Sequence, residues 1–209
     1  ERMRFIINDL HKINASLTGS LVDYYSRICL SERFGITFND IRVNGICSSE
    51  KDKLGILNSY KKIKEGNYTL IDVFMVSLAH TLSFGDLNME LYESFLSALY
   101  ILKLDDFSEI KNFWNSIDIE TISLNPVLSN ENVLADADVI FNDTLLDIKC
   151  SKTDIEYEFL QLLGYTSLAR QKEIFINNMG IVNFLYGEMK LYDISGLQNE
   201  TFVEFLKLL

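Results

Sequence analysis

The pattern of hydrophobic and polar positions changes near residue 118. Before it, apolar residues recur at intervals of three and four, the spacing of helices that bury one face. This pattern predicts helices at residues 21–34, 51–65, 69–83 and 88–104 and a short one around residues 113–114. After it, short β-branched or aromatic runs predict strands at residues 119–124, 133–141, 145–150, 181–186 and 189–192. Further helices are expected at residues 155–170 and 201–209.

This order of elements predicts the fold class. Helices first, then a hairpin, a helix and a second hairpin, indicate an α/β (α+β) protein with a central mixed β-sheet flanked by helices. We expect residues 1–118 to form a helical region that packs on a core of residues 119–209, giving one compact domain overall. The chain has 209 residues, of which 48% are hydrophobic, with only 10 Gly and 1 Pro, so it can bury such a core.

The second and third predicted strands are joined by a turn that sets their register. Asn142-Asp143 is a two-residue connection that tolerates positive φ, which favours a tight hairpin. Phe141 then pairs with Thr144, and every further pair keeps the same index sum of 285.

This register places acidic side chains and a lysine on one face of the hairpin. Asp138 falls opposite Asp147, and Asp136 falls opposite Lys149, with Cβ atoms roughly 5 Å apart. Two carboxylates so close repel each other, and a divalent cation such as Mg²⁺ removes the repulsion. Lys149 is placed to hold an attacking water or to stabilise developing phosphorane charge. The alternative is an exposed polar sheet face that carries Asp-Ile-Lys incidentally.

The helix expected at residues 155–170 adds two polar side chains. Thr153 or Asp154 is a plausible N-cap for this helix. Gln161 and Tyr165 are four residues apart and therefore lie on one face of it.

Together these residues resemble the PD-(D/E)XK nuclease superfamily, specifically its RecB-like branch with a Gln-x-x-x-Tyr motif. The resemblance rests on Asp138, on Asp147-Ile148-Lys149 and on Gln161-Leu-Leu-Gly-Tyr165, and it covers about residues 130–170. It implies a restriction-endonuclease-like core. It also implies metal-dependent hydrolysis of phosphodiester bonds that leaves a 5′-phosphate, with DNA favoured over RNA as substrate.

The resemblance also assigns roles to these residues. Asp138 and Asp147 would hold one or two Mg²⁺ or Mn²⁺ ions, and Lys149 would orient water or stabilise charge. Gln161 and Tyr165 would shape the site or contact nucleic acid. All five are therefore candidate catalytic residues.

Two points of this assignment stay open. The Ala-Asp-Ala-Asp run offers Asp136 as well as Asp138 as the first metal ligand, and we prefer Asp138 because it opposes Asp147 directly. Relatives often carry a histidine or glutamate on the first helix, where this chain has Asp23 and Glu32 instead.

Charge argues against a nuclease that acts unaided. The formal net charge is −11, and residues 130–175 contain nine acidic and four basic side chains. A protein that grips a polyanion by itself normally presents a basic surface. A protein partner or a missing region would then supply that surface, or a local groove would use the lysines at 51–64 together with Lys149, Lys152, Arg170 and Lys172. The competing hypothesis is a non-catalytic PD-(D/E)XK-like module that serves protein or nucleic-acid interaction in an assembly.

The remaining sequence features indicate an intracellular protein without a membrane partner. No apolar run reaches the roughly 18 residues that span a bilayer, and no basic-then-apolar leader opens the chain. Cys29, Cys47 and Cys150 are odd in number and lack zinc-like spacing, which is typical of reduced core residues in a cytoplasmic protein.

Overall fold

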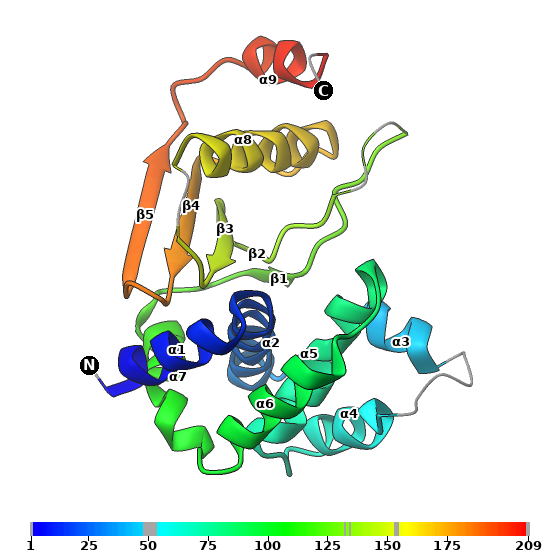
Figure 1. The fold of residues 1–209 in the computed structure, drawn as a ribbon. Helices are drawn as coiled ribbons and strands as arrows, with labels where there is room; N and C mark the ends of the chain where they lie inside the picture. Colours follow the sequence, from blue (N-terminus) through cyan, green and yellow to red (C-terminus); the bar gives the residue numbers. More distant parts are fainter. Residues whose placement is uncertain (1, 48–53, 132, 134, 153–154, 208–209) are drawn as a thin grey trace. The chain divides into compact units, whose positions relative to one another are not determined.

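The computed structural model describes residues 2–47, 54–131, 133, 135–152 and 155–207. The chain divides into two compact units, Glu1–Ile117 and Asp118–Leu209. The described part of the first unit is helical, and the described strands lie in the second (Figure 1). The predicted fold class is confirmed, since the chain is α+β with a five-stranded mixed sheet and accompanying helices.

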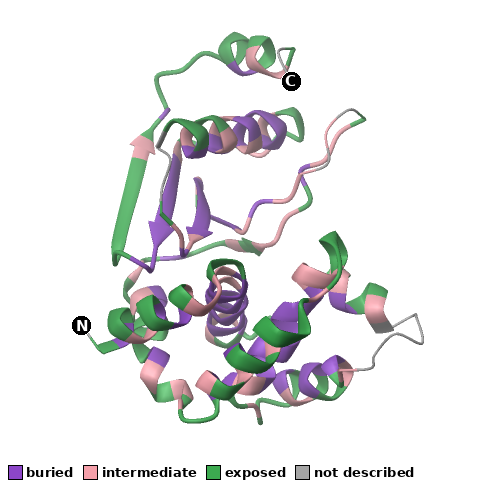
Figure 2. Cartoon of the chain, viewed as in Figure 1, coloured by how far each residue is buried: buried purple, intermediate pink, exposed green. Residues whose placement is uncertain are grey.

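In the first unit, helix α5 (Leu70–Phe84) packs against α2 (Ala15–Phe34) and α4 (Ile56–Lys64), and much of α2 and α5 is buried (Figure 2). The predicted start of α5 is confirmed by a capping box, in which the side chains and backbone N–H groups of Thr69 and Asp72 bond reciprocally. The other helical segments are α1 (Arg2–Ile13), α3 (Ile41–Cys47), α6 (Met89–Leu99), the 3₁₀ turn η1 (Leu104–Phe107) and α7 (Ser108–Ser116).

Some helix boundaries in the first unit differ from the sequence pattern. The pattern did not indicate α1 or α3. Helix α6 ends at Leu99 instead of residue 104, because the Lys103 N–H donates to Asp106 Oδ2 (2.9 Å) and starts the separate turn η1. Helix α4 begins at Ile56, while Lys51 and Lys53 lie outside the described residues.

A charged network is buried within the first unit. Arg27 is only 1% exposed, and its guanidinium donates to Asp40 at 3.0 Å and to Asp23 at 2.9 Å. Burial alone would raise the pKa of Asp40, but Arg27 and the Val43 N–H hold that pKa below its usual value. Asp23 therefore belongs to a structural network around Arg27.

The second unit contains one sheet with the order β1-β2-β3-β4-β5. Strands β3 and β4 are parallel and are joined through α8, whereas the other neighbours are antiparallel. The elements are β1 (Ile122–Leu124), β2 (Val139–Phe141), β3 (Thr144–Lys149), α8 (Ile155–Gln171), β4 (Asn178–Asn183), β5 (Glu188–Asp193) and α9 (Asn199–Leu206). The predicted N-cap of α8, Thr153 or Asp154, lies outside the described residues.

Strand β2 is much shorter than the predicted strand at residues 133–141. Its partner segment contains Asn125, which has a φ of 48°, followed by Pro126, which has no N–H to donate. Pairing continues only in pieces, with the Ala137 N–H donating to the Pro126 carbonyl and an isolated bridge between Val127 and Asp136. The ladder is therefore interrupted just before Asp138.

Helix α8 covers one face of the sheet, as Figure 1 shows, and the core of the unit lies between them. Ile140, Leu145 and Met179 from the sheet form a buried cluster with Leu162 and Ala169 from α8. Because strand residues alternate between faces, Asp138, Asp147 and Lys149 share this face of the sheet. The predicted polar face therefore continues directly into an apolar core.

Candidate functional site

The hairpin that carries the candidate site has the predicted register. Val139 pairs with Leu146 and Phe141 pairs with Thr144, as the index sum of 285 requires. Asn142 has a φ of 51°, and its side-chain oxygen accepts from the N–H groups of Glu120 and Thr121 at 2.9 and 3.1 Å. The turn residue therefore sets the hairpin and also ties it to the segment that leads into β1.

Asp138 lies just beyond the last ladder pair, where its carboxylate replaces a backbone partner. Its Oδ2 atom accepts a 2.6 Å hydrogen bond from the N–H of Ile148, the residue after Asp147. This short charge-assisted bond holds the side chain of Asp138 against β3. Asp147 itself is 5% exposed, so both carboxylates are set at the edge of the core.

Lys149 links the hairpin to α8. Its ammonium nitrogen lies 2.7 Å from Asp147 Oδ2 and donates to Gln161 Oε1 at 3.0 Å. Gln161 Nε2 in turn donates to the Tyr165 hydroxyl at 3.0 Å, which places both residues on one face of α8. The structure thus connects Asp147, Lys149, Gln161 and Tyr165 in one chain of contacts.

The contact between Asp147 and Lys149 is an ion pair rather than a well-aligned hydrogen bond. Asp147 Oδ2 is buried, and in the described part of the chain it accepts no hydrogen bond of good geometry. A buried carboxylate oxygen normally has a directional donor or a metal ion as partner. This oxygen therefore retains a lone pair for a further ligand.

The charges of the site shift the pKa values of two of its residues, Lys149 and Tyr165. Burial alone would lower the pKa of Lys149, but Asp147, Asp138 and Glu158 outweigh it and raise that pKa, so Lys149 stays protonated. Burial raises the pKa of Tyr165, and the nearby carboxylates of Asp147, Asp138 and Asp136 raise it further. Tyr165 therefore keeps its hydroxyl proton as a donor.

Asp136 is not placed as its predicted register implied. The ladder between β2 and β3 ends at Val139, so the predicted pairing of Asp136 with Lys149 does not form, and Asp136 bridges Val127 instead. The Asp138 carboxylate is the physical reason, since it takes the Ile148 N–H that the next ladder pair would use, while the Ala137 N–H donates to the Pro126 carbonyl. Asp138, which bonds to β3 directly, is the better placed first ligand.

Sequence reasoning missed Glu158 as a member of the site. This residue is 7% exposed on α8, one turn before Gln161, and its charge helps to raise the pKa of Lys149. The sequence pattern places Glu158 only near the positive end of the helix dipole. Its position three residues before Gln161, and so on the same helix face, was the signal that could have identified it.

The donor chemistry of the site fits a hard divalent cation. Asp138 and Asp147 offer carboxylate oxygens, and Mg²⁺ is usually held by one or two carboxylates with waters completing its octahedron. Among the residues that the structure describes, no group of three or more His, Cys, Asp or Glu side chains is arranged around one point. Asp138 and Asp147 are the residues that would hold such an ion, with waters as its remaining ligands.

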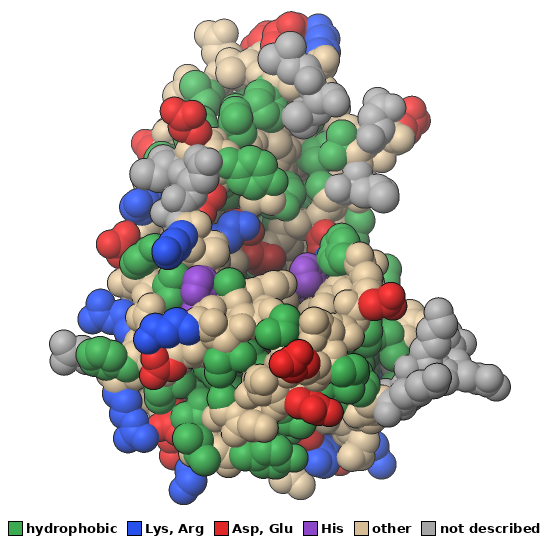
Figure 3. Space-filling model, viewed as in Figure 1, with side chains coloured by type: hydrophobic (Ala, Val, Ile, Leu, Met, Phe, Trp, Pro, Cys, Tyr) green, Lys and Arg blue, Asp and Glu red, His purple; other side chains and the backbone are tan. Residues whose placement is uncertain are grey.

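The other sequence candidates lie in the first unit and have partners there. Glu32 accepts from the Tyr68 hydroxyl at 2.6 Å and from Lys111 at 3.4 Å. Of the lysine cluster, Lys62 pairs with Asp72 at 3.1 Å, and the Lys64 ammonium lies 4.1 Å from the Tyr60 ring centroid. In the view of Figure 3, basic side chains are interspersed with acidic and apolar ones and do not merge into one basic field.

Comparison of the chain with protein-family models, with curated proteins and with solved structures finds no match. The class to which the chain can be assigned is therefore that of its fold, an α+β protein with a mixed five-stranded sheet. In the described ranges, no helix combines the length and apolar character needed to cross a membrane.

Proposed function

We propose that the chain is a metal-dependent nuclease of the PD-(D/E)XK type that hydrolyses phosphodiester bonds, with DNA favoured as substrate. The observation that carries this proposal is the convergence of Asp138, Asp147 and Lys149, with Lys149 tied to Gln161 on α8. An incidental Asp-Ile-Lys on a solvated sheet face would leave its lysine free in water. Here the lysine is partly desolvated, and it contacts Asp147 on β3 and Gln161 on α8.

In this proposal each side chain has a task that follows from its contacts. Lys149, kept protonated by its acidic neighbours, would orient the attacking water and stabilise the charge that develops on the phosphoryl oxygens. Gln161 would keep the ammonium of Lys149 in place, and the Tyr165 hydroxyl would donate to a substrate oxygen. Water adds to phosphorus while the bond to the leaving oxygen breaks, and the product retains a 5′-phosphate.

Asp138 and Asp147 would hold Mg²⁺ or Mn²⁺. Bound there, the ion would lower the pKa of a coordinated water and neutralise phosphate charge. The Ile148 N–H keeps the Asp138 carboxylate turned toward β3, where Asp147 lies.

The decisive experiment compares cleavage of single- and double-stranded DNA and of RNA, in Mg²⁺ and in Mn²⁺, by the wild type and two variants. Asp147→Asn and Lys149→Ala should each lower the cleavage rate by about 10²-fold or more, because each removes a charge that acts in the transition state. The exposed Lys207 on the last turn beyond α9 is the matched control, and Lys207→Ala should cleave as the wild type does.

Calorimetric titration with Mn²⁺ adds a readout independent of turnover. Binding should occur at the wild type and be lost in Asp147→Asn. The nuclease proposal is wrong if all variants process every substrate alike and the wild type binds no metal ion.

The net charge of −11 favours a second candidate function, a non-catalytic module of the same type that serves protein or nucleic-acid interaction. It predicts that the wild type binds Mn²⁺ weakly or not at all. It also predicts that neither the wild type nor Lys149→Ala cleaves nucleic acid, and that this substitution changes only the stability of the chain.

A further inference from the structure

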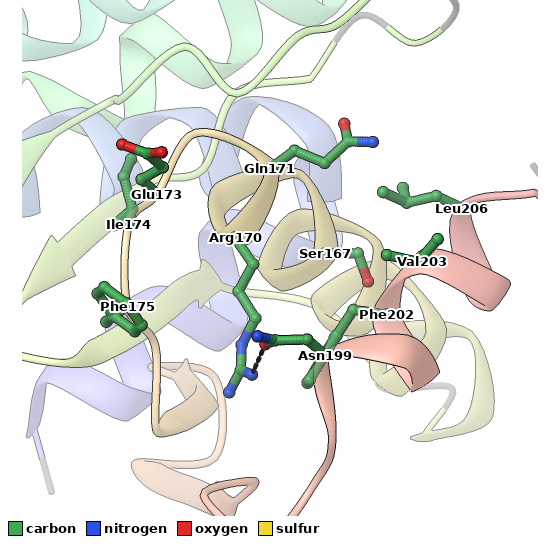
Figure 4. Close-up of a pocket in the computed structure, with 10 residues that line it drawn as sticks. All are labelled: Ser167, Arg170, Gln171, Glu173, Ile174, Phe175, Asn199, Phe202, Val203 and Leu206. Atoms are coloured by element: carbon green, nitrogen blue, oxygen red, sulfur yellow. Dashed lines mark hydrogen bonds between the residues drawn. The ribbon is translucent and has the colours of Figure 1, made fainter.

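A cavity lies in the second unit, between the C-terminal half of α8, the following loop and α9 (Figure 4). Its volume is about 590 Å³, which is within the range of small-molecule sites. Most of its wall is apolar, and Phe175 and Val203 are 79% and 50% exposed there. The apolar lining residues are Ile174, Phe175, Phe202, Val203 and Leu206.

Two charged residues, Arg170 and Glu173, line this cavity, and Figure 4 shows the Glu173 carboxylate directed away from the Arg170 guanidinium. This guanidinium donates to Asn199 Oδ1 at 2.9 Å and to the Ile176 carbonyl at 2.8 Å, and it stacks over the Phe202 ring at 4.0 Å (Figure 4). All three partners are neutral. Asn199 and Phe202 fasten α9 to α8, and Ile176 ties the loop before β4 to α8, but none of the three compensates the positive charge.

The charge of Arg170 is left without a counter-ion in the described part of the second unit. No ion pair joins it to a carboxylate there, and its buried Nε–H has no acceptor. Burial accordingly lowers the pKa of Arg170. The guanidinium is partly buried and its Nε–H lacks an acceptor, so the carboxylate of a ligand could pair with it.

The backbone at the rim of the cavity is strained. Glu173, the residue that follows the last turn of α8, has a φ of 60°, a conformation that costs a non-glycine residue about 1 kcal/mol. Its N–H donates to the Arg170 carbonyl, and the next N–H, that of Ile174, donates to the Ala169 carbonyl. These two bonds form a Schellman cap that ends α8, and the turn directs Ile174 and Phe175 into the cavity wall.

We propose that this cavity binds a small amphiphilic acid, whose apolar chain lies against Phe175, Val203 and Leu206 and whose carboxylate pairs with Arg170. An acid is favoured over a neutral lipid because the cation is otherwise uncompensated. The site lies among α8, α9 and their connecting loop and does not use the hairpin carboxylates. It is therefore independent of the proposed nuclease activity.

Calorimetric titration of the full chain with decanoate, below the concentration at which it forms micelles, tests this proposal. The matched probe is 1-decanol, which has the same chain without charge. Decanoate should bind about tenfold more tightly than decanol, the effect of one partly buried ion pair. Equal affinity for the two probes would overturn the proposal.

Variants separate the charge of Arg170 from its packing role. Arg170→Lys should keep the preference for decanoate, and Arg170→Gln should abolish it. Either change at Arg170 could loosen α9, so a further variant is needed that keeps this residue. Val203→Trp fills the cavity and should lower the affinity for decanoate and for decanol at least tenfold. The control is Leu160→Trp, because Leu160 is 53% exposed on α8 and does not line the cavity. If Val203→Trp binds decanoate as tightly as Leu160→Trp does, the cavity is not the site.

Discussion

At the residue scale, Lys149 decides what the candidate site can do. A lysine on a strand would ordinarily extend into water, but this one is held by Asp147 from its own strand and by Gln161 from α8. Its side chain is 24% exposed, so its charge acts in a partly desolvated place where electrostatic interactions are stronger than in water.

The hydrogen bond from Lys149 to Gln161 is open to a direct test. Gln161→Leu keeps the size of the side chain and removes the acceptor, so the lysine should lose its orientation. We expect kcat for DNA cleavage to fall about tenfold or more, with KM little changed, because positioning acts mainly in the transition state. The control is Leu160→Ala, one residue earlier and on the exposed side of α8. A rise in KM alone, with kcat unchanged, would instead assign Gln161 to substrate binding.

The buried Arg27 makes a separate prediction about stability. Asp40→Asn leaves the guanidinium with weaker compensation and should lower the free energy of unfolding by about 3 kcal/mol near neutral pH. Because the pKa of Asp40 is depressed in the folded state, its contribution is present above the unfolded pKa and is lost as pH falls through the folded pKa.

The pH dependence of this contribution can be measured by urea unfolding, with circular dichroism as the signal. The difference between wild type and Asp40→Asn should be full near neutral pH and should shrink below about pH 4. Asp9→Asn, which breaks the exposed pair of Asp9 with Lys12, should cost less than about 0.5 kcal/mol. A difference that grows on acidification would contradict the assignment.

At the element scale, the β2–β3 hairpin depends on Asn142. Replacing it with alanine removes the side-chain bonds to Glu120, Thr121 and Asp118 and places a Cβ-bearing residue without compensation at a φ of 51°. Asn142→Ala should therefore destabilise the chain by about 2 kcal/mol.

Asn142→Gly separates the two contributions. Glycine relieves the backbone conformation but cannot restore the side-chain bonds, so its cost should be about half that of alanine. Urea unfolding of both variants measures the difference. If alanine is tolerated better than glycine, the side-chain bonds and not the turn conformation carry the effect.

At the scale of the whole molecule, the negative net charge limits the affinity of the chain for a polyanion. With a net charge of −11, it should bind an oligonucleotide weakly in the presence of EDTA. Ca²⁺ at the two carboxylates should strengthen binding without cleavage, and the dependence on salt should be shallow because few phosphates are neutralised. Fluorescence anisotropy of a labelled oligonucleotide, in EDTA and in Ca²⁺ at several salt concentrations, measures the affinity and its dependence on salt. Tight, steeply salt-dependent binding in EDTA would instead reveal a basic groove within the chain.

Local rules explain why much of the architecture could be predicted. The register between Val139 and Leu146 follows from the length of the turn alone, the end of α2 follows from Gly35, and the start of α5 follows from Thr69 and Asp72. Gln161 and Tyr165 share a helix face because they are four residues apart. Each of these features depends on contacts between residues close together in the sequence.

Other features depend on residues distant in sequence, and only the tertiary structure decided them. The hairpin ladder stops where the Asp138 carboxylate takes the Ile148 N–H, and Asp136 bridges Val127 on the other side of β2. Glu158 joined the site because α8 packs on the sheet near Lys149.

The sequence by itself thus determined the α+β order of elements, the hairpin register and the residues of the candidate site. Tertiary packing determined which acids stand beside Lys149, the burial of Arg27 with Asp40, and the cavity around Arg170. The physical reason is that burial and charge pairing sum over neighbours brought together from separate elements, whereas periodicity and turn geometry act along a single stretch of chain.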